Sequence, residues 1–339
     1  MIQDVLNRYI LQSAQEIQFR LGHRTSFKKN REWIEADSEA LSLTEWEDLK
    51  DLCLRSEEKI FLETKGHIRG IFSDHKNTWV FSFVEWKENL KAYFSYVSPA
   101  TNLNHIQNPT YLEALKNKTG IHIISGFKQS GKSTLIRELI DDLKRNSPQQ
   151  IVLHSNPSVL TQILDDTVFQ LGADTLSWET NHPFYDGVDV VIADMNDISH
   201  IEKWVQFAEE GKKVFISMAA ANVENVILSI KSRLGREQDQ PLWQRFVRQL
   251  SSVLNQKIVG LNEGSVHEIL VPQAKGKEAL LHFSLTSLAQ KELENLNHYQ
   301  SFNQAIIQAI VRRRFDIKTA FSVSTDPDEL DQMLKKMGL

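Results

Sequence analysis

Residues 121–139 read IHIISGFKQSGKSTLIREL, and this stretch decides the fold of the chain. It begins with the apolar run Ile121 to Ile124, which is long enough for a buried strand, and it ends in an amphipathic run that continues to Leu143. Between the two runs, Gly126 to Ser133 match the pattern G-x-x-x-x-G-K-[ST]. A strand, a glycine loop and a helix in this order favour a phosphate-binding loop over a chance glycine turn.

Phosphate binding explains why glycine, lysine and serine stand at these positions of the loop. Gly126 and Gly131 let the backbone curl so that successive N–H groups point at one phosphate, and the next helix adds its positive N-terminal end. Lys132 is expected to reach the β- and γ-phosphates, and the Ser133 hydroxyl to hold Mg²⁺. We therefore predict that the chain binds ATP with Mg²⁺. The predicted nucleotide-binding residues are Gly126, Phe127, Lys128, Gln129, Ser130, Gly131, Lys132, Ser133 and Thr134.

Composition sets outer bounds on the class of protein. A chain of 339 residues with 41% hydrophobic and 24% charged residues has room for two or three ordinary packed domains. A net charge of −5 gives no reason to expect nucleic acid as a partner. The single cysteine, Cys53, excludes an internal disulfide and fits a reducing compartment. There is no signal-peptide pattern and no apolar run near ~18 residues, so we expect a cytoplasmic protein without a membrane span.

Residues 1–98 are predicted to form a small N-terminal α+β domain with an antiparallel sheet. The first helix is expected from Asp4 to Ser13, and a second from Leu43 to about Leu54 with Thr44 as its cap. The expected strands are Glu16–Leu21, Lys59–Leu62, His67–Ser73, Trp79–Val84 and Leu90–Val97.

Residues 99–109, with two prolines and three asparagines, read as a linker, and residues 110–339 as a second domain. The second domain is expected to begin with a helix from Tyr111 to Asn117 and to alternate strands with helices after the glycine loop. That alternation predicts a mainly parallel sheet with helices on both faces. The expected elements are strands Gln150–Leu153, Val188–Ala193 and Val214–Met218, a helix Ile198–Glu210, a hairpin around Lys257–Val271, and tail helices Phe302–Arg314 and Asp328–Lys336.

Several runs outside the loop resemble the pilus-retraction (PilT-like) branch of the type II/type IV secretion ATPases. Near the start, Ala14-Gln-Glu-Ile-Gln-Phe19 is similar to the family's ASDIH strand, and Leu43-Thr-Glu45 to its LTxEE helix start. Ala208-Glu-Glu-Gly-Lys-Lys-Val-Phe215 is close to the run AExGHLVF. In the tail, Ser301-Phe-Asn-Gln304 and Thr325-Asp-Pro-Asp-Glu-Leu330 resemble SFDQSL and TNPEEL, which favours the retraction branch. These matches keep the family's order and cover nearly the whole chain.

The resemblance implies an architecture and a setting. It implies a small N-terminal α+β (PAS-like) domain, a linker, and a RecA-like P-loop ATPase core with a helical C-terminal tail. It further implies a homo-hexameric ring with nucleotide between subunits, coupled to a platform protein of the pilus at the inner membrane. The protein would then be cytoplasmic, or peripheral at the inner face of that membrane.

Motifs on the hydrolysis side of the family's site are altered here. The acidic pair before proline, EDP, is replaced by Ser155-Asn156-Pro157, and uncharged side chains are poor Mg²⁺ ligands. The Walker B strand ends in Asp194 where the family has glutamate. Because aspartate is one methylene shorter, its carboxylate would lie about 1 Å short of the position that the glutamate base takes. We take Asp194 as the best remaining catalytic acid and metal ligand, with Asp189 as a weaker alternative.

Two further motifs are missing or displaced. The family's THTN motif aligns with Ser217-Met-Ala-Ala-Ala221, which contains no histidine. The strand that carries arginines toward a neighbour's γ-phosphate aligns with either Leu90–Phe94 or His67–Gly70. At most Lys91 or Arg69 remains there, and lysine does not reproduce arginine's fork.

The loop is intact, whereas the hydrolysis motifs are altered. We therefore predict a nucleotide-binding protein linked to pilus retraction or twitching-type motility, with weak or no ATP hydrolysis. The alternative is a non-enzymatic regulatory or structural paralogue. Such a paralogue would form a hetero-oligomer with an active PilT-type ATPase, with nucleotide as an assembly ligand.

Overall fold

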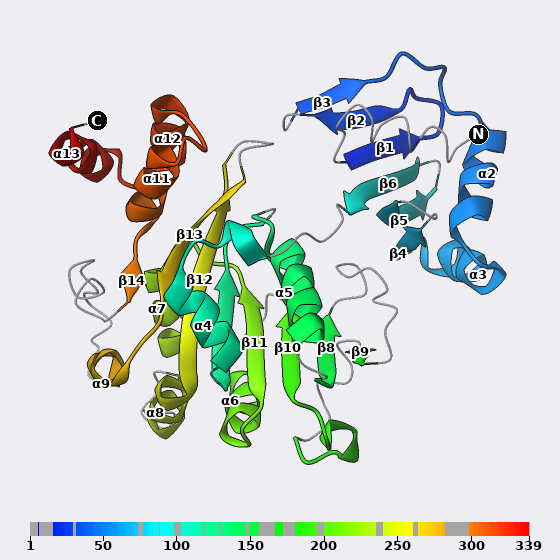
Figure 1. The fold of residues 1–339 in the computed structure, drawn as a ribbon. Coiled ribbons are helices and arrows are strands. Elements are labelled where there is room, and N and C mark those ends of the chain that lie inside the picture. Colours follow the sequence, from blue (N-terminus) through cyan, green and yellow to red (C-terminus); the bar gives the residue numbers. More distant parts are fainter. Residues whose placement is uncertain are drawn as a thin grey trace. The chain divides into compact units, whose positions relative to one another are not determined.

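The computed structural model describes residues 6, 16–29, 32–73, 77–87, 89–97, 103–117, 119–128, 130–146, 149–155, 167–171, 180–194, 200–234, 240–259, 264–281 and 298–338. The chain divides into two compact units, with the first boundary between residues 99 and 100. Figure 1 shows both units coloured along the sequence. Apart from Leu6, the helix expected over residues 4–13 lies outside the described residues.

The N-terminal unit is built on an antiparallel sheet. Among the described residues its strand order is β3-β2-β1-β6-β5-β4. The strands are β1 (Glu16–Arg20), β2 (Ser26–Lys29), β3 (Glu32–Glu35), β4 (His67–Ser73), β5 (Thr78–Trp86) and β6 (Asn89–Val97). Alternate residues of β5, Trp79, Phe81 and Phe83, are buried because successive side chains of a strand point to opposite faces. Helix α2 (Leu43–Cys53) covers that face, and its Trp46 packs edge-on to Phe83 with ring centroids 5.5 Å apart.

One predicted strand of this unit is wrong. Lys59–Leu62 lies inside helix α3 (Ser56–Lys65). Acidic residues in the first turn and Lys65 in the last complement the helix dipole, and Gly66 ends the helix at a φ of +73°. Of the apolar run that suggested a strand, only Leu62 is buried.

Helix α2 begins where predicted, but its cap is Ser42 and not Thr44. The Ser42 hydroxyl accepts a hydrogen bond from the Glu45 backbone N–H at 3.3 Å. In return the Glu45 carboxylate accepts from the Ser42 backbone N–H at 2.9 Å, which completes a capping box.

The second unit carries a larger, mainly parallel sheet. Within the described ranges its strand order is β14-β13-β12-β7-β11-β10-β8-β9. The strands are β7 (Gly120–Ser125), β8 (Ile151–Ser155), β9 (Val168–Leu171), β10 (Val190–Asp194), β11 (Lys213–Met218), β12 (Leu250–Ile258), β13 (Ser265–Leu270) and β14 (Tyr299–Gln300). From β12 to β9 neighbouring strands run parallel, whereas β13 and β14 add antiparallel edges.

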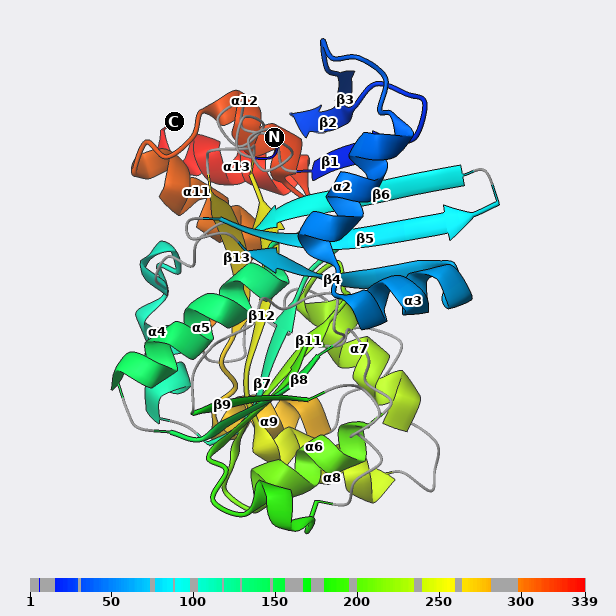
Figure 2. The same cartoon turned by 90° about the vertical axis from the view of Figure 1, so that its right-hand side faces the viewer.

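Helices cover both faces of this sheet, as the alternation of elements predicted. Helices α4 (Pro109–Asn117) and α5 (Lys132–Asn146) lie on one face. Helices α6 (Ile201–Glu209), α7 (Val223–Leu234) and α8 (Gln240–Gln249) lie on the other, as the turned view in Figure 2 makes clear. The predicted α/β architecture is confirmed: an N-terminal α+β unit precedes a unit with a mainly parallel sheet, helices on both faces and a helical tail.

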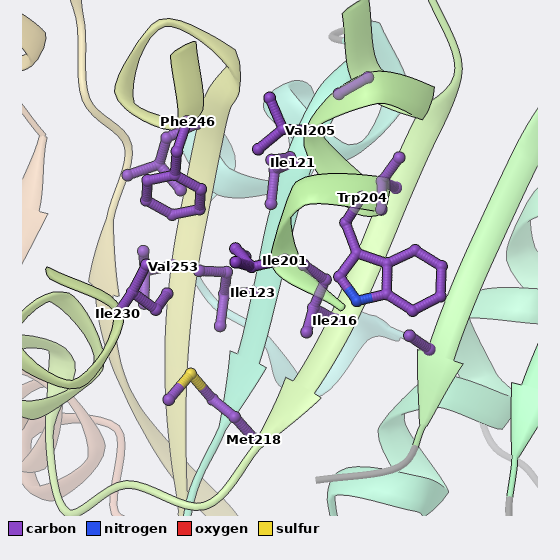
Figure 3. Close-up of a cluster of buried hydrophobic side chains, with 14 of the residues drawn as sticks. Ile121, Ile123, Ile201, Trp204, Val205, Ile216, Met218, Ile230, Phe246 and Val253 are labelled. Carbon is purple, nitrogen blue, oxygen red and sulfur yellow. The ribbon is translucent and has the colours of Figure 1, made fainter. Parts of the chain in front are cut away.

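Figure 3 shows the apolar cluster between the sheet and α6, α7 and α8. Ile121 and Ile123 of β7 share this face because they are two residues apart, and they meet Trp204 of α6 and Phe246 of α8 in one cluster. Trp204 is 1% exposed. Apolar residues are two positions apart along the strands and three or four positions apart along the helices. Their side chains therefore point to the same side and form one core.

The end of the chain differs in detail from the prediction. The expected hairpin exists, but β12 begins at Leu250, earlier than the predicted position near residue 257. Its first seven residues are all buried because β7 and β13 flank it. The tail contains α11 (Phe302–Val311), the unpredicted α12 (Ile317–Val323) and α13 (Pro327–Met337), which is capped by Asp326. Helix α9 (Ala274–Leu281) lies between the hairpin and the tail.

No helix in the described ranges combines the length and the apolar character needed to cross a bilayer.

Candidate functional site

The glycine loop lies at the carboxyl end of β7, within the parallel part of the sheet, and leads directly into α5. Ligands of open α/β sheets bind outside the carboxyl ends of the strands. The predicted strand, loop and helix are therefore present in the arrangement that the sequence required. Of the loop itself, Gln129 lies outside the described residues.

Both loop glycines are needed for their backbone conformation and for close packing. Gly126 has a φ of +149° and Gly131 a φ of +85°. A Cβ at Gly126 would lie 2.5 Å from the backbone oxygen of Gln256, and one at Gly131 would lie 2.6 Å from the Nε2 atom of the same residue. Any side chain at either position would collide with β12.

The Lys132 ammonium holds the curl of the loop together. Its Nζ donates hydrogen bonds to the backbone oxygens of Gly126 at 2.8 Å and Phe127 at 3.0 Å. A turn between Phe127 and Ser130 closes the loop through an N–H to oxygen contact of 3.1 Å. Lys132 is only 7% exposed, so its positive charge is buried within the loop. Hydrogen-bond acceptors are what make such burial tolerable.

The Ser130 hydroxyl is a buried polar group that makes no hydrogen bond to the described part of the chain. Ser130 is 6% exposed, and its Oγ has no hydrogen-bond partner among the residues that the structure describes. An unpaired buried hydroxyl costs free energy. The loop combines two glycines at positive φ, a buried ammonium and a hydroxyl with no partner among the described residues. This combination is suited to an anion with several oxygen atoms, such as a phosphate group.

The remaining predicted loop residues take different positions. Phe127 and Lys128 are exposed, whereas Ser133 and Thr134 are half-buried in the first turn of α5. The predicted residues that surround the loop's interior are thus Gly126, Ser130, Gly131 and Lys132.

Asp194 is the last residue of β10, and its backbone is in register with Ser155 of β8. One strand, β11, separates β10 from β7, so the backbones of β10 and β7 lie about 10 Å apart at the spacing of neighbouring strands. The side chains of Asp194 and Ser155, and all of Asn156 and Pro157, lie outside the description.

The alternative acid, Asp189, lies at the other end of β10. Its Oδ2 accepts a hydrogen bond from the Gln150 backbone N–H at 2.9 Å, at the amino end of β8 and β10. The loop is at the carboxyl end of the sheet, so the length of a strand separates Asp189 from it. This placement disfavours Asp189 as a catalytic acid.

The strand beside β7 ends without a histidine. Ser217 and Met218 of β11 are buried and in register with Ile124 and Ser125. The backbone oxygen of Ala220 accepts a hydrogen bond from Asn255 Nδ2 at 3.1 Å. Small and apolar residues therefore occupy positions 217–221, where the resemblance led us to look for a histidine motif.

The two candidates for an arginine finger both belong to the N-terminal unit. Arg69 is exposed on β4, and Lys91 is half-buried on β6. The choice between them stays open.

The sequence did not predict that Gln256 of β12 and His267 of β13 lie next to the loop. Gln256 Nε2 donates a hydrogen bond to the Ser130 backbone oxygen at 2.7 Å, and Gln256 Oε1 lies 3.2 Å from His267 Nε2. One signal was available, because Asn255 and Gln256 are adjacent polar residues in the buried strand LSSVLNQKI. Buried polar residues are retained where they are hydrogen-bonded.

These features define a two-unit α/β protein with a glycine loop at the carboxyl end of its parallel sheet. At the level of sequence, no protein-family model and no curated protein matches the chain. Solved structures do match it.

The pilus retraction motor PilT, solved with bound ADP, is 17% identical, with 97% of this chain and 98% of that chain covered at a TM-score of 0.76. The ATPase DotB of Legionella pneumophila is 15% identical, with 95% and 94% covered at 0.76. DotB of Yersinia pseudotuberculosis is 16% identical, with 98% and 93% covered at 0.72. The chain therefore has the fold of PilT and DotB over nearly its whole length, as the resemblance implied.

Proposed function

We propose that the chain binds ATP with Mg²⁺ through the loop from Gly126 to Thr134. The observation that carries the proposal is the loop itself: two glycines at positive φ, curled around the buried Lys132 ammonium. The unpaired Ser130 hydroxyl adds a group suited to a phosphate oxygen. The fold gives further support, because PilT shares it and was solved with ADP.

Each residue of the site would have a defined task. Lys132 would exchange its bonds to the loop carbonyls for bonds to the β- and γ-phosphates. Ser133 and Asp194 would hold Mg²⁺, which neutralises negative charge on the phosphates when bound. Asp194 would also be the acid that orients water if ATP is hydrolysed.

We further propose that hydrolysis is weak or absent. The acidic pair is replaced at Ser155 and Asn156, the strand beside β7 ends without a histidine, and glutamate is replaced at Asp194. An arginine finger alone contributes roughly 10³–10⁵ in rate to phosphoryl transfer, and here at most one candidate cation remains. Losing several such contributions together would leave little turnover.

The proposed setting is that of a PilT-like protein in the cytoplasm, either free or peripheral at the inner membrane. It would act in pilus retraction or twitching-type motility as a homo-hexamer, or as a hetero-oligomer with an active PilT-type ATPase, next to the pilus platform protein. If turnover is absent, the regulatory paralogue is the better description, with nucleotide as a ligand for assembly.

Calorimetric titration of the full chain with ATP and Mg²⁺ tests the binding proposal. Lys132→Ala is expected to abolish or strongly weaken binding, whereas Lys275→Ala, at an exposed lysine of α9 outside the loop, is the control and should bind like the parent. If Lys132→Ala binds as tightly as the parent, the loop is not the nucleotide site.

Phosphate release and mass in solution then separate the motor from the paralogue. We expect little turnover. Strong turnover by the isolated protein that Asp194→Asn abolishes would refute weak hydrolysis and identify an active ATPase. Light scattering with and without ATP reports whether nucleotide drives assembly.

A further inference from the structure

We propose that Gln256 and His267 are positioning residues for phosphate binding: Gln256 shapes the glycine loop from β12, and His267 orients the Gln256 side chain from β13. This inference rests on the proposed nucleotide site and identifies what sets the direction of its amide groups. Neither residue belongs to the loop motif.

Gln256 is in contact with three parts of the loop. Its Nε2 donates to the Ser130 backbone oxygen at 2.7 Å. Its backbone oxygen would lie 2.5 Å from a Cβ at Gly126, and its Nε2 would lie 2.6 Å from a Cβ at Gly131. Gln256 is 5% exposed. One buried residue of β12 therefore lies close to the loop at Gly126, Ser130 and Gly131.

The bond from Gln256 to Ser130 fixes the orientation of a peptide group. In a trans peptide, the C=O and the next N–H point in opposite directions. Because the Ser130 oxygen is bound on the β12 side, the Gly131 N–H must point to the opposite side. Successive backbone N–H groups that point the same way are what bind a phosphate in such a loop. Gln256 thus acts on phosphate binding through Gly131.

His267 fixes which way the Gln256 amide faces. Its Nε2 lies 3.2 Å from Gln256 Oε1; because a carboxamide oxygen only accepts, this hydrogen bond forms in the tautomer that carries the proton on Nε2. The Ser265 hydroxyl lies 3.1 Å from the same nitrogen. Residues 256 and 267 are also direct cross-strand partners in the β12–β13 ladder. Without this donor, the Gln256 amide would lose one of the two hydrogen bonds that hold its orientation, and only the bond to the Ser130 oxygen would remain.

The same histidine is linked to the helix that follows the loop. The ring of His105, in the short turn η1 (Leu103–His105), lies 5.5 Å from the ring of His267 between centroids. His105 Nδ1 is 3.6 Å from Glu138 Oε2 of α5, and Glu138 is 4% exposed. Burial, then His105 and then Arg314 lower the pKa of His267 to about 3, so the imidazole is neutral near pH 7. A polar cluster with the half-buried His105 at its centre therefore connects His267 to helix α5.

Hydrogen exchange of the nucleotide-free full chain tests the positioning directly. Gln256→Met keeps the volume but removes both hydrogen bonds, and it is expected to raise exchange of the amides over residues 126–132 about tenfold. Lys257→Met is the matched control from the same strand, since Lys257 contacts the Phe302 ring at 4.5 Å. The control should leave loop exchange unchanged.

The His267 variants provide a second, independent arm. His267→Phe removes the donor and should raise loop exchange, whereas His267→Gln retains an amide donor and should restore the parent value. Because His267 acts through Gln256, the double variant Gln256→Met, His267→Phe should exchange like Gln256→Met alone. Parent-like exchange in both Gln256→Met and His267→Phe would overturn the proposal.

ATP affinity then connects positioning to binding. Gln256→Met should weaken ATP about tenfold while Lys257→Met binds like the parent; equal affinity in both overturns the role in phosphate binding. Failure of the nucleotide site itself would show as Lys132→Ala binding like the parent. Loop exchange is measured without nucleotide, so these two failures are distinguishable.

Discussion

Acid should destabilise the second unit through its buried histidines, and His267 allows the size of the effect to be worked out. An exposed histidine takes up a proton near pH 6.5, but the pKa of His267 in the folded chain is lowered to about 3, chiefly by burial. Between these values the unfolded chain binds one more proton than the folded chain. The free energy of unfolding therefore falls as the pH falls through this window.

From pH 7 to pH 5 the difference in proton binding at His267 lowers the free energy of unfolding by about 2 kcal/mol. His154, fully buried with its Nε2 3.2 Å from the Tyr185 hydroxyl, has a pKa lowered to about 4, first by burial and then by Lys203 and His200. It adds a similar amount, about 2 kcal/mol, over the same interval.

Urea unfolding at pH 7 and pH 5, followed by circular dichroism and tryptophan emission, measures this loss. His267→Gln keeps a hydrogen-bond donor but cannot titrate, so it should lose about 2 kcal/mol less than the parent between the two pH values. His23→Gln, at an exposed histidine of the N-terminal unit, is the control. If His267→Gln and the parent lose the same stability between pH 7 and pH 5, then His267 is not neutral in the folded chain at these pH values.

Three further predictions concern single contacts. Gly131→Ala puts a Cβ 2.6 Å from Gln256 Nε2 at a φ of +85°, and urea titration should show a loss of about 1–3 kcal/mol. Ser42→Ala removes the cap of α2 and should cost about 1 kcal/mol in the unfolding of the N-terminal unit, whereas Thr44→Ala should cost clearly less; equal costs would contradict the capping box. Trp204→Ala should cost about 3–5 kcal/mol in thermal or urea unfolding. Trp204→Phe should cost less than half of that, because the indole N–H has no partner among the described residues.

Local patterns predicted the centre of the second unit well. The strand before the loop is a short apolar run, and the helix after it has apolar residues at helical spacing, so β7 and α5 were visible in one window of sequence. The parallel sheet followed from the alternation of such windows. In the N-terminal unit the same reasoning failed where an apolar triplet, Ile60 to Leu62, lies on a largely exposed helix. It also missed β2 and β3, which are four residues each, and β3 is exposed throughout.

The loop motif was readable, but its support was not. Gln256 and Ser130 are 126 positions apart, and only the pairing of β12 with β7 brings them together. Strand pairing over such a distance depends on the whole sheet and leaves no local pattern. Adjacent polar residues in a buried strand mark an unusual position without revealing its partner.

The loop and Gln256 are far apart in the sequence, and this separation affects when the loop can fold during synthesis. During synthesis from the N-terminus, the complete glycine motif emerges well over a hundred residues before Gln256 does. Contacts of such high sequence separation are slow to form because loop closure costs entropy first. We therefore expect the loop to gain its shape late, after β12 has joined the sheet. A fragment that ends before Leu250 would carry every residue of the motif and still lack the surface that shapes it.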